Sequence, residues 1–212
     1  MKIAINNSLY VSVLPLVGFN FLLIAFRMFV TSGIGFGFLI WNLVLSLVPL
    51  CISLYLTSRG TSTLKIAIGS LIWLLFLPNA PYILTDFLHF RKINLTMPAW
   101  FDLLLLASYS ISGLLFGLLS MWQMHQVWKK SFGNISDLMI PASALLSGFG
   151  IYLGRYERYN SWDVLSDPIR ILHDSAVLLI ELRTIGFTIG YGTLLLLVYY
   201  FIRLNSQRDQ NP

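Results

Sequence analysis

The chain has 212 residues, of which 57% are hydrophobic and only 11% are charged, and its mean hydropathy is +0.75. Soluble domains carry about 25% charged residues, so this composition excludes an ordinary soluble protein. It predicts an integral membrane protein whose first partner is the lipid bilayer. The formal net charge of +5 comes from 14 basic residues scattered between apolar stretches, and this scatter argues against nucleic-acid binding.

Uncharged runs predict about six transmembrane helices, because about 20 apolar residues cross the roughly 30 Å hydrocarbon core. The runs cover residues 3–26, 28–58, 66–85, 103–124, 138–154 and 184–202. The first run follows Lys2, as in a signal peptide, but its length predicts a retained helix. No linker or charge block divides the chain, so we expect an all-α polytopic bundle that forms one integral membrane domain over residues 1–212.

Small residues recur at a spacing of four in three of these runs. The pairs are Gly113 with Gly117, Ala144 with Gly148, and Gly186 with Gly190. This spacing lets helix backbones approach closely in lipid, so we expect these positions to lie at helix contacts.

The third run is interrupted by the string LPNAPYILTD, Leu77 to Asp86. Pro78 and Pro81 remove two backbone hydrogen-bond donors, so the helix must kink or break. Pro78 lies about 18 Å along a helix that starts at the beginning of the run, which places the break inside the membrane. Asn79 could cap the second half or bond the freed carbonyls. A plain proline kink and a broken helix that lines a binding site, as in some transporters, both fit this pattern.

If an α-helix resumes after the second proline, Tyr82, Asp86 and His89 lie on one face at i, i+4 and i+7. The carboxylate and the imidazole are then within mutual reach. They could bind a cation, transfer a proton or form a structural pair. Arg91 and Lys92 follow closely and are ordinary ion-pair partners for the carboxylate.

A second unusual string, GRYERYNSWD, covers Gly154 to Asp163 and mixes two arginines, two acids and three aromatic residues. This composition is typical of an aromatic belt at the membrane surface and also of a polar site. Arg155 and Arg158 could hold an anionic headgroup or substrate, with Asn160 close by in the same string.

An interfacial amphipathic helix is predicted near residues 168–182. Pro168 suits a first helical turn, and Arg170 and His173 share a polar face opposite Ile, Leu and Ala. We expect this helix to lie on the outer leaflet, as a lid over the mouth of the bundle.

A metal site can be drawn from His89, His173, Asp86 and Asp163, but nothing in their spacing requires it. The sequence has no Gly-rich phosphate loop, no His-Glu-x-x-His and no Cys-x-x-Cys. We therefore predict no metal and no cofactor.

Charge predicts the orientation. With six spans both termini lie on one face of the membrane. The basic residues divide equally between this face and the opposite one, whereas seven of the nine acidic residues fall on the opposite face. The face with surplus positive charge suits anionic lipid, so we place it and both termini in the cytoplasm. The candidate polar site then lies on the extracytoplasmic face of a multi-pass protein of the cell membrane.

With its LPNAPYILTD string and its GRYERYNSWD string, which ends in NSWD, the chain resembles a family of bacterial membrane proteins, the domain-of-unknown-function family thirteen sixty-one. The resemblance extends over nearly the whole chain. It implies a small multi-pass membrane protein with no assigned activity, and it carries over no catalytic residue.

Two hypotheses stand beside a purely structural membrane protein. The first is a binding or transport component with an outward pocket for a small polar or anionic ligand, working with a membrane partner subunit. The second is a cell-envelope enzyme with Asp86 or Asp163 as general base and arginines that clamp a lipid-linked phosphate. The candidate polar site comprises Asn79, Tyr82, Asp86, His89, Arg155, Arg158, Asn160, Asp163 and His173.

Overall fold

The computed structural model describes residues 7–58, 62–91 and 97–208, and it contains helices and no strand over these ranges. The first half of the chain forms α1 (Asn7–Thr31), α2 (Phe38–Ser58), α3 (Thr63–Phe76), α4 (Asn79–Tyr82) and the 3-10 helix η1 (Ile83–Arg91). The second half forms α5 (Ala99–Phe132), the 3-10 turn η2 (Gly133–Ile135), α6 (Ser136–Tyr152), the π-helix η3 (Leu153–Glu157), α7 (Asp163–Ser166), α8 (Pro168–Leu178) and α9 (Leu182–Arg208).

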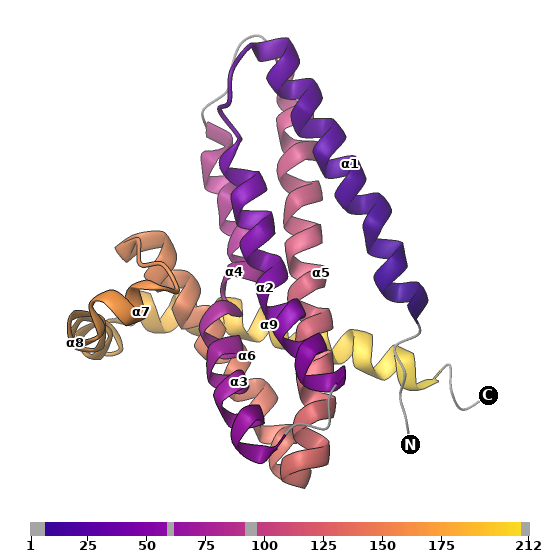
Figure 1. The fold of residues 1–212 in the computed structure, drawn as a ribbon. Coiled ribbons are helices and arrows are strands. Elements are labelled where there is room, and N and C mark those ends of the chain that lie inside the picture. The colour runs from indigo at the N-terminus through magenta and orange to yellow at the C-terminus, as the bar shows by residue number, and fades with distance from the viewer. Residues whose placement is uncertain (1–6, 59–61, 92–96, 209–212) are drawn as a thin grey trace.

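Five segments of the described chain are long and apolar enough to cross a membrane, as expected of a multi-pass membrane protein. They are Val13–Thr31, Phe38–Thr57, Thr63–Phe90, Ala99–Glu157 and Leu182–Asn205. The sequence predicts six, and the difference lies in the fourth segment, which contains both α5 and α6. Gly133, at a φ of 62° that favours glycine, reverses the chain between these two helices (Figure 1).

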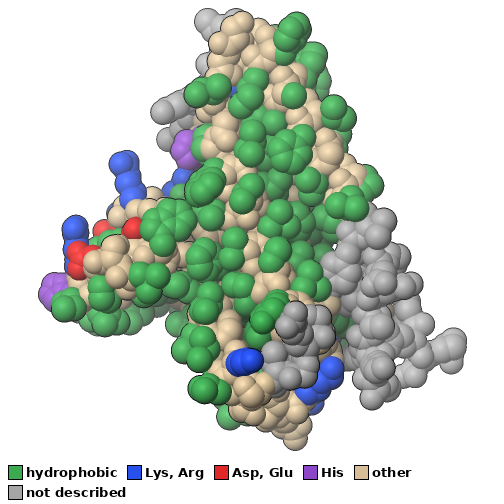
Figure 2. Space-filling view, viewed as in Figure 1, with side chains coloured by type: hydrophobic (Ala, Val, Ile, Leu, Met, Phe, Trp, Pro, Cys, Tyr) green, Lys and Arg blue, Asp and Glu red, His purple; other side chains and the backbone are tan. Residues whose placement is uncertain are grey.

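Helix α5 is the centre of the molecule. It runs the full height of Figure 1 and packs against α1, α2, α4, η1 and α6, while α9 runs across it. Buried apolar side chains form two clusters along α5, one with Leu105 and Tyr109 and the other with Met121 and Met124. The exterior is apolar as well, since hydrophobic side chains cover most of the face in Figure 2. Such an exterior fits contact with lipid.

Two polar contacts fasten α1 to α5. Arg27 binds Asp102 through two buried contacts, Nε to Oδ1 at 2.6 Å and Nη2 to Oδ2 at 3.1 Å. About two helical turns earlier in α1, Asn20 donates to Ser112 Oγ at 2.7 Å and accepts from Ser108. Bonds of this kind between membrane helices hold them at a fixed register.

Close packing of α6 on α9 uses the expected Gly148 on α6 but not the expected glycines on α9. A Cβ atom at Gly148 would collide with the carbonyl oxygen of Thr188 and lie 2.9 Å from the nitrogen of Gly192. Gly186 and Gly190 have no heavy atom within 4 Å of such a position, so the prediction that they lie at a helix contact is wrong. Gly192, outside the spacing-of-four pattern, takes that role because it faces Ala144 and Leu145.

This packing predicts opposite effects for two matched substitutions. Gly148→Ala should destabilise the protein by about 1–3 kcal/mol, because the added methyl group meets backbone atoms that cannot rotate away. Gly190→Ala should be neutral or stabilising by up to about 1 kcal/mol, from helix propensity alone. Thermal unfolding in detergent measures both, and equal melting temperatures for the two variants would contradict the α6–α9 contact.

Candidate functional site

The third apolar segment is broken where the two prolines lie. Helix α3 ends at Phe76, α4 spans only Asn79–Tyr82, and the chain continues as the 3-10 helix η1 rather than as an α-helix. Pro78 at the break packs against Gly150 of α6, where a Cβ atom would overlap the proline ring. The missing side chain of Gly150 therefore lets α6 lie directly against the break.

Side chains satisfy the backbone at this break. Asn79 Nδ2 donates to the carbonyl of Phe76 at 2.9 Å, as expected for a freed carbonyl, and also to Ser161 Oγ at 2.9 Å. Ser161 in turn donates to the carbonyl of Leu75 at 3.0 Å. The loop after η3 is thus bonded to the break from a position 82 residues away in sequence. Irregular backbone within an apolar segment is stable when protein groups supply its hydrogen bonds, as they do here.

A cavity of about 530 Å³ opens beside the break. Its volume lies within the range of small-ligand sites. Its walls come from α2, the α3–α4 break, η1, the end of α6 with η3, the following loop, α7 and α8. Seven predicted site residues line it, namely Asn79, Tyr82, Asp86, His89, Arg155, Arg158 and Asn160.

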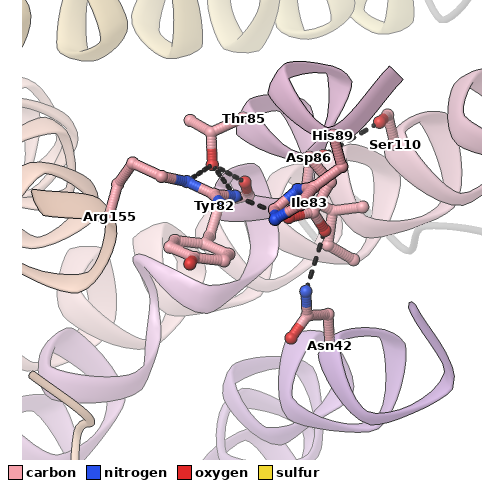
Figure 3. Close-up of polar contacts among 8 residues, drawn as sticks. All are labelled: Asn42, Tyr82, Ile83, Thr85, Asp86, His89, Ser110 and Arg155. Atoms are coloured by element: carbon pink, nitrogen blue, oxygen red, sulfur yellow. Dashed lines mark hydrogen bonds and ion pairs between the residues drawn. The ribbon is translucent and has the colours of Figure 1, made fainter. Parts of the chain in front are cut away.

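The centre of the cavity wall is an ion pair between Asp86 and Arg155 (Figure 3). Arg155 Nη2 lies 2.5 Å from Asp86 Oδ1, and Asn42 Nδ2 donates to Asp86 Oδ2 at 2.8 Å. Arg155 also donates to Thr85 Oγ1, from Nε at 2.7 Å and from Nη2. Its guanidinium carbon lies 4.4 Å from the centre of the Tyr82 ring. Both carboxylate oxygens and one edge of the guanidinium are therefore engaged.

Local helix geometry explains how this pair forms. Arg155 belongs to the π-helix η3, whose wider turn ends the regular α-helical register of α6 and directs the side chain across to η1. The expected partners of Asp86 were its sequence neighbours Arg91 and Lys92. Lys92 and the side chain of Arg91 lie outside the described residues, and the ion pair seen joins residues 69 positions apart.

His89 approaches the same carboxylate. Its Nδ1 lies 3.8 Å from Asp86 Oδ1, and this buried nitrogen has no hydrogen-bond partner among the described residues. The reach between the two groups is confirmed, but the expected α-helical spacing is wrong. In a 3-10 helix side chains at i and i+3 share a face, and this spacing brings the imidazole over the carboxylate.

Arg158 lies at the cavity mouth with an unusual backbone. Its φ of 63° places it in the left-handed region, which costs a non-glycine residue about 1–3 kcal/mol. The side chain is exposed, and no acidic group in the described ranges forms an ion pair with it. Because Arg155 compensates Asp86, Arg158 gives the cavity a surplus positive charge.

Two predicted site residues stand outside the cavity. Asp163 accepts from the backbone and side-chain nitrogens of Asn160, at 2.6 and 3.2 Å, and so shapes the loop. The side chain of His173 is 76% exposed on α8 and lies 3.2 Å from Asp174. No group of three or more His, Cys, Asp or Glu side chains suited to a metal occurs in the described parts of the chain, so the four-residue metal arrangement does not form.

A hydrogen bond joins the loop to α8 outside the apolar segments. Tyr159 donates to Asp174 Oδ2 at 2.6 Å. This bond holds the pKa of the Asp174 carboxyl below its usual range and raises the pKa of the Tyr159 hydroxyl. The contact therefore persists to lower pH than an unbonded carboxylate would allow, because a depressed pKa delays protonation as the pH falls.

Sequence reasoning missed Asn42, Thr85 and Ser161 as site residues. Asn42 is the one amide in the long apolar run 28–58, and that isolation was a usable signal for an intramembrane contact. Thr85 and Ser161 are ordinary residues within the two strings, and nothing in their own pattern marks them.

The two arginines of η3 and the loop predict different responses to the same substitution. Arg155→Lys should destabilise the protein by about 1.5–3 kcal/mol, because lysine cannot bond Thr85 and Asp86 together. Arg158→Lys should change stability by less than about 0.5 kcal/mol, since its side chain is exposed and unpaired within the described ranges. Thermal unfolding compares them, and equal losses would contradict the structural role of Arg155.

A family model described as "Protein of unknown function (DUF1361)" matches residues 41–198. This range contains both strings and every cavity residue except Phe38, and it leaves α1 outside. No curated protein and no solved structure matches the chain. Because the match covers well over half of its length, the chain belongs to the DUF1361 family, whose function is unknown.

Proposed function

We propose that this protein is a membrane-embedded binding or transport component whose cavity accepts a small anionic solute. The observation that carries the proposal is the charge of the cavity wall. Asp86 is compensated by Arg155 at 2.5 Å, whereas Arg158 is exposed at the mouth with no acidic partner in the described ranges. A neutral pair and one free guanidinium leave a positive site, which favours an anion.

The rest of the wall suits a small solute with polar and apolar parts. Asn160, Tyr159 and Ser161 of the loop contribute polar lining, and Trp41 and Leu45 of α2 supply apolar surface. Ligand sites in proteins combine apolar surface with polar groups that fix orientation, and this wall carries both. The enclosing segments are broken helices, as in transporters that bind at discontinuous helices.

The enzyme hypothesis has less support. A general base must contact the substrate directly, but the Asp86 side chain is 1% exposed and its two oxygens are turned to Arg155 and Asn42 within the protein. The other proposed base, Asp163, does not line the cavity. The chemistry of the wall therefore favours binding over acid–base catalysis.

We propose six membrane crossings, with α5 and α6 as two of them. The start of α1 and the end of α9 then lie on the same side, as they do in Figure 1. Since α9 is strongly inclined to α5, we place the membrane normal between their axes. The cavity faces the extracytoplasmic side, and the end that carries Lys129, Lys130 and Arg203 faces the cytoplasm.

Helix α8 is proposed to lie at the extracytoplasmic membrane surface. It buries Ile171 and Leu178 against the protein and exposes Ile169 and Leu172 beside the charged Arg170. An exposed apolar strip next to charge is typical of an interfacial helix. Transport driven by nucleotide hydrolysis would further require a partner subunit, because the sequence has no nucleotide-binding loop.

Anion binding is tested by thermal unfolding of the purified protein with sulfate, phosphate and acetate, against glycerol as a neutral control. A bound anion at 100 times its Kd should stabilise the protein by about 2.7 kcal/mol. Arg158→Ala should weaken the binding of the stabilising anion at least about tenfold, which is a loss of about 1.4 kcal/mol of binding free energy. Arg170→Ala, an exposed arginine outside the cavity, is the matched control. Stabilisation by none of the anions would refute the proposal.

Orientation is tested by cysteine labelling in intact cells, on a Cys51→Ser background that removes the one cysteine. Ser166→Cys on α7 should react with a membrane-impermeant maleimide, and Lys130→Cys should react only after the cells are opened. Both positions are exposed, so accessibility in the fold is matched. The reverse pattern would invert the proposed topology.

A further inference from the structure

We infer that Asp86 is a proton-binding site, so that an anion and one proton bind to the cavity together. This inference rests on the proposed anion site and adds its co-ligand. It follows from the contacts of one guanidinium group, because Arg155 is at once the partner of Asp86 and part of the cavity wall.

An anion in the cavity competes with Asp86 for the charge of Arg155. Asp86 is 1% exposed and the Arg155 side chain 11% exposed, so little water screens their interaction. Nε and Nη2 of Arg155 are taken by Thr85 and Asp86, and the remaining edge of the group is the one left for a ligand. The bound anion and the Asp86 carboxylate would then share the single charge of Arg155. Repulsion between the two anionic groups favours the protonated form of Asp86, so the site takes up one proton when the anion binds.

Among the described residues, no second full charge beside Asp86 replaces Arg155. The contact from α2 is the neutral amide of Asn42, and its own segment contributes Tyr82 and His89. From α5, Ser110 bonds the carbonyl of Ile83, while the acidic Asp102 of that helix is held by Arg27. Arg158, the other cation at the cavity, is exposed at the mouth and attracts the anion itself.

His89 provides the route for the proton. Its ring stands half-exposed beside the cavity, and Nδ1 lies 3.8 Å from Asp86 Oδ1 (Figure 3). The imidazole gains a proton at one nitrogen and releases one from the other, so it returns to neutral after each transfer. The unpaired state of Nδ1 leaves it available for this exchange.

The step is a simple protonation. One proton from solvent forms an O–H bond at Asp86 Oδ1, no bond to the anion forms or breaks, and the anion keeps its charge. Asp86 Oδ2 continues to accept from Asn42, so the neutral carboxyl group keeps a partner inside the protein. Dissociation of the anion leaves Asp86 as the one anionic group beside Arg155 among the described residues, and the carboxyl group then releases the proton.

Isothermal titration with sulfate tests the inference, because sulfate itself gains and loses no proton between about pH 5 and pH 8, where the titrations are made. Titrations in buffers of different ionisation enthalpy count the protons. The wild-type protein should take up about one proton per sulfate, and its Kd should fall about tenfold for each unit of decreasing pH. Asp86→Asn should bind sulfate without uptake and without this pH dependence. Glu181→Gln, at an exposed carboxylate outside the cavity, should behave as wild type.

Each alternative outcome decides a different point. No sulfate binding by the wild-type protein overturns the anion site and this inference with it. Two outcomes overturn the inference and leave the anion site standing. One is sulfate binding without proton uptake, and the other is proton uptake that persists in Asp86→Asn and disappears in His89→Gln. If Asp86→Asn does not fold, infrared difference spectra of the wild-type protein decide, since sulfate must produce the band of a protonated carboxyl group.

Discussion

The contact between Asp86 and Arg155 determines the arrangement of the cavity wall. It joins the 3-10 helix after the proline break to the π-helix at the end of α6, at 2.5 Å and almost out of contact with solvent. Removing one partner of a buried ion pair leaves an uncompensated charge, a loss of about 3–5 kcal/mol in proteins. The pair therefore holds two irregular segments in one relative position, and the cavity exists between them.

Both segments are irregular for reasons that lie in the sequence and in the packing. Pro78 ends α3, and Gly150 lets α6 approach the ring of that proline. The loop after η3 then reaches back, where Ser161 bonds Asn79 and the carbonyl of Leu75. Each break thus supplies hydrogen-bonding groups that the other needs, which is why polar backbone is tolerated at this depth.

The sequence predicted the parts of the site but not their pairing. Composition and apolar runs indicate a helical membrane protein, and Pro78 and Pro81 mark the break because proline lacks a donor wherever it stands. The link between Asp86 and Arg155 spans 69 residues, and no local spacing reports such a contact. For the same reason Gly192 was missed at the α6–α9 contact, since a facing helix, and not a spacing of four, selects it.

A second polar cluster at the other end of the molecule shows why charge alone does not make a site. His125 contacts Tyr199 at 2.6 Å and Asp137 at 3.0 Å, and Asp137 also binds Lys129 at 2.8 Å. These bonds join α5, α6 and α9, and Asp137 stands at the surface where water screens it. In that cluster the acidic group already has its cations beside it. At the cavity the exposed Arg158 has no acidic partner in the described ranges, and the proposed anion would supply its counter-charge.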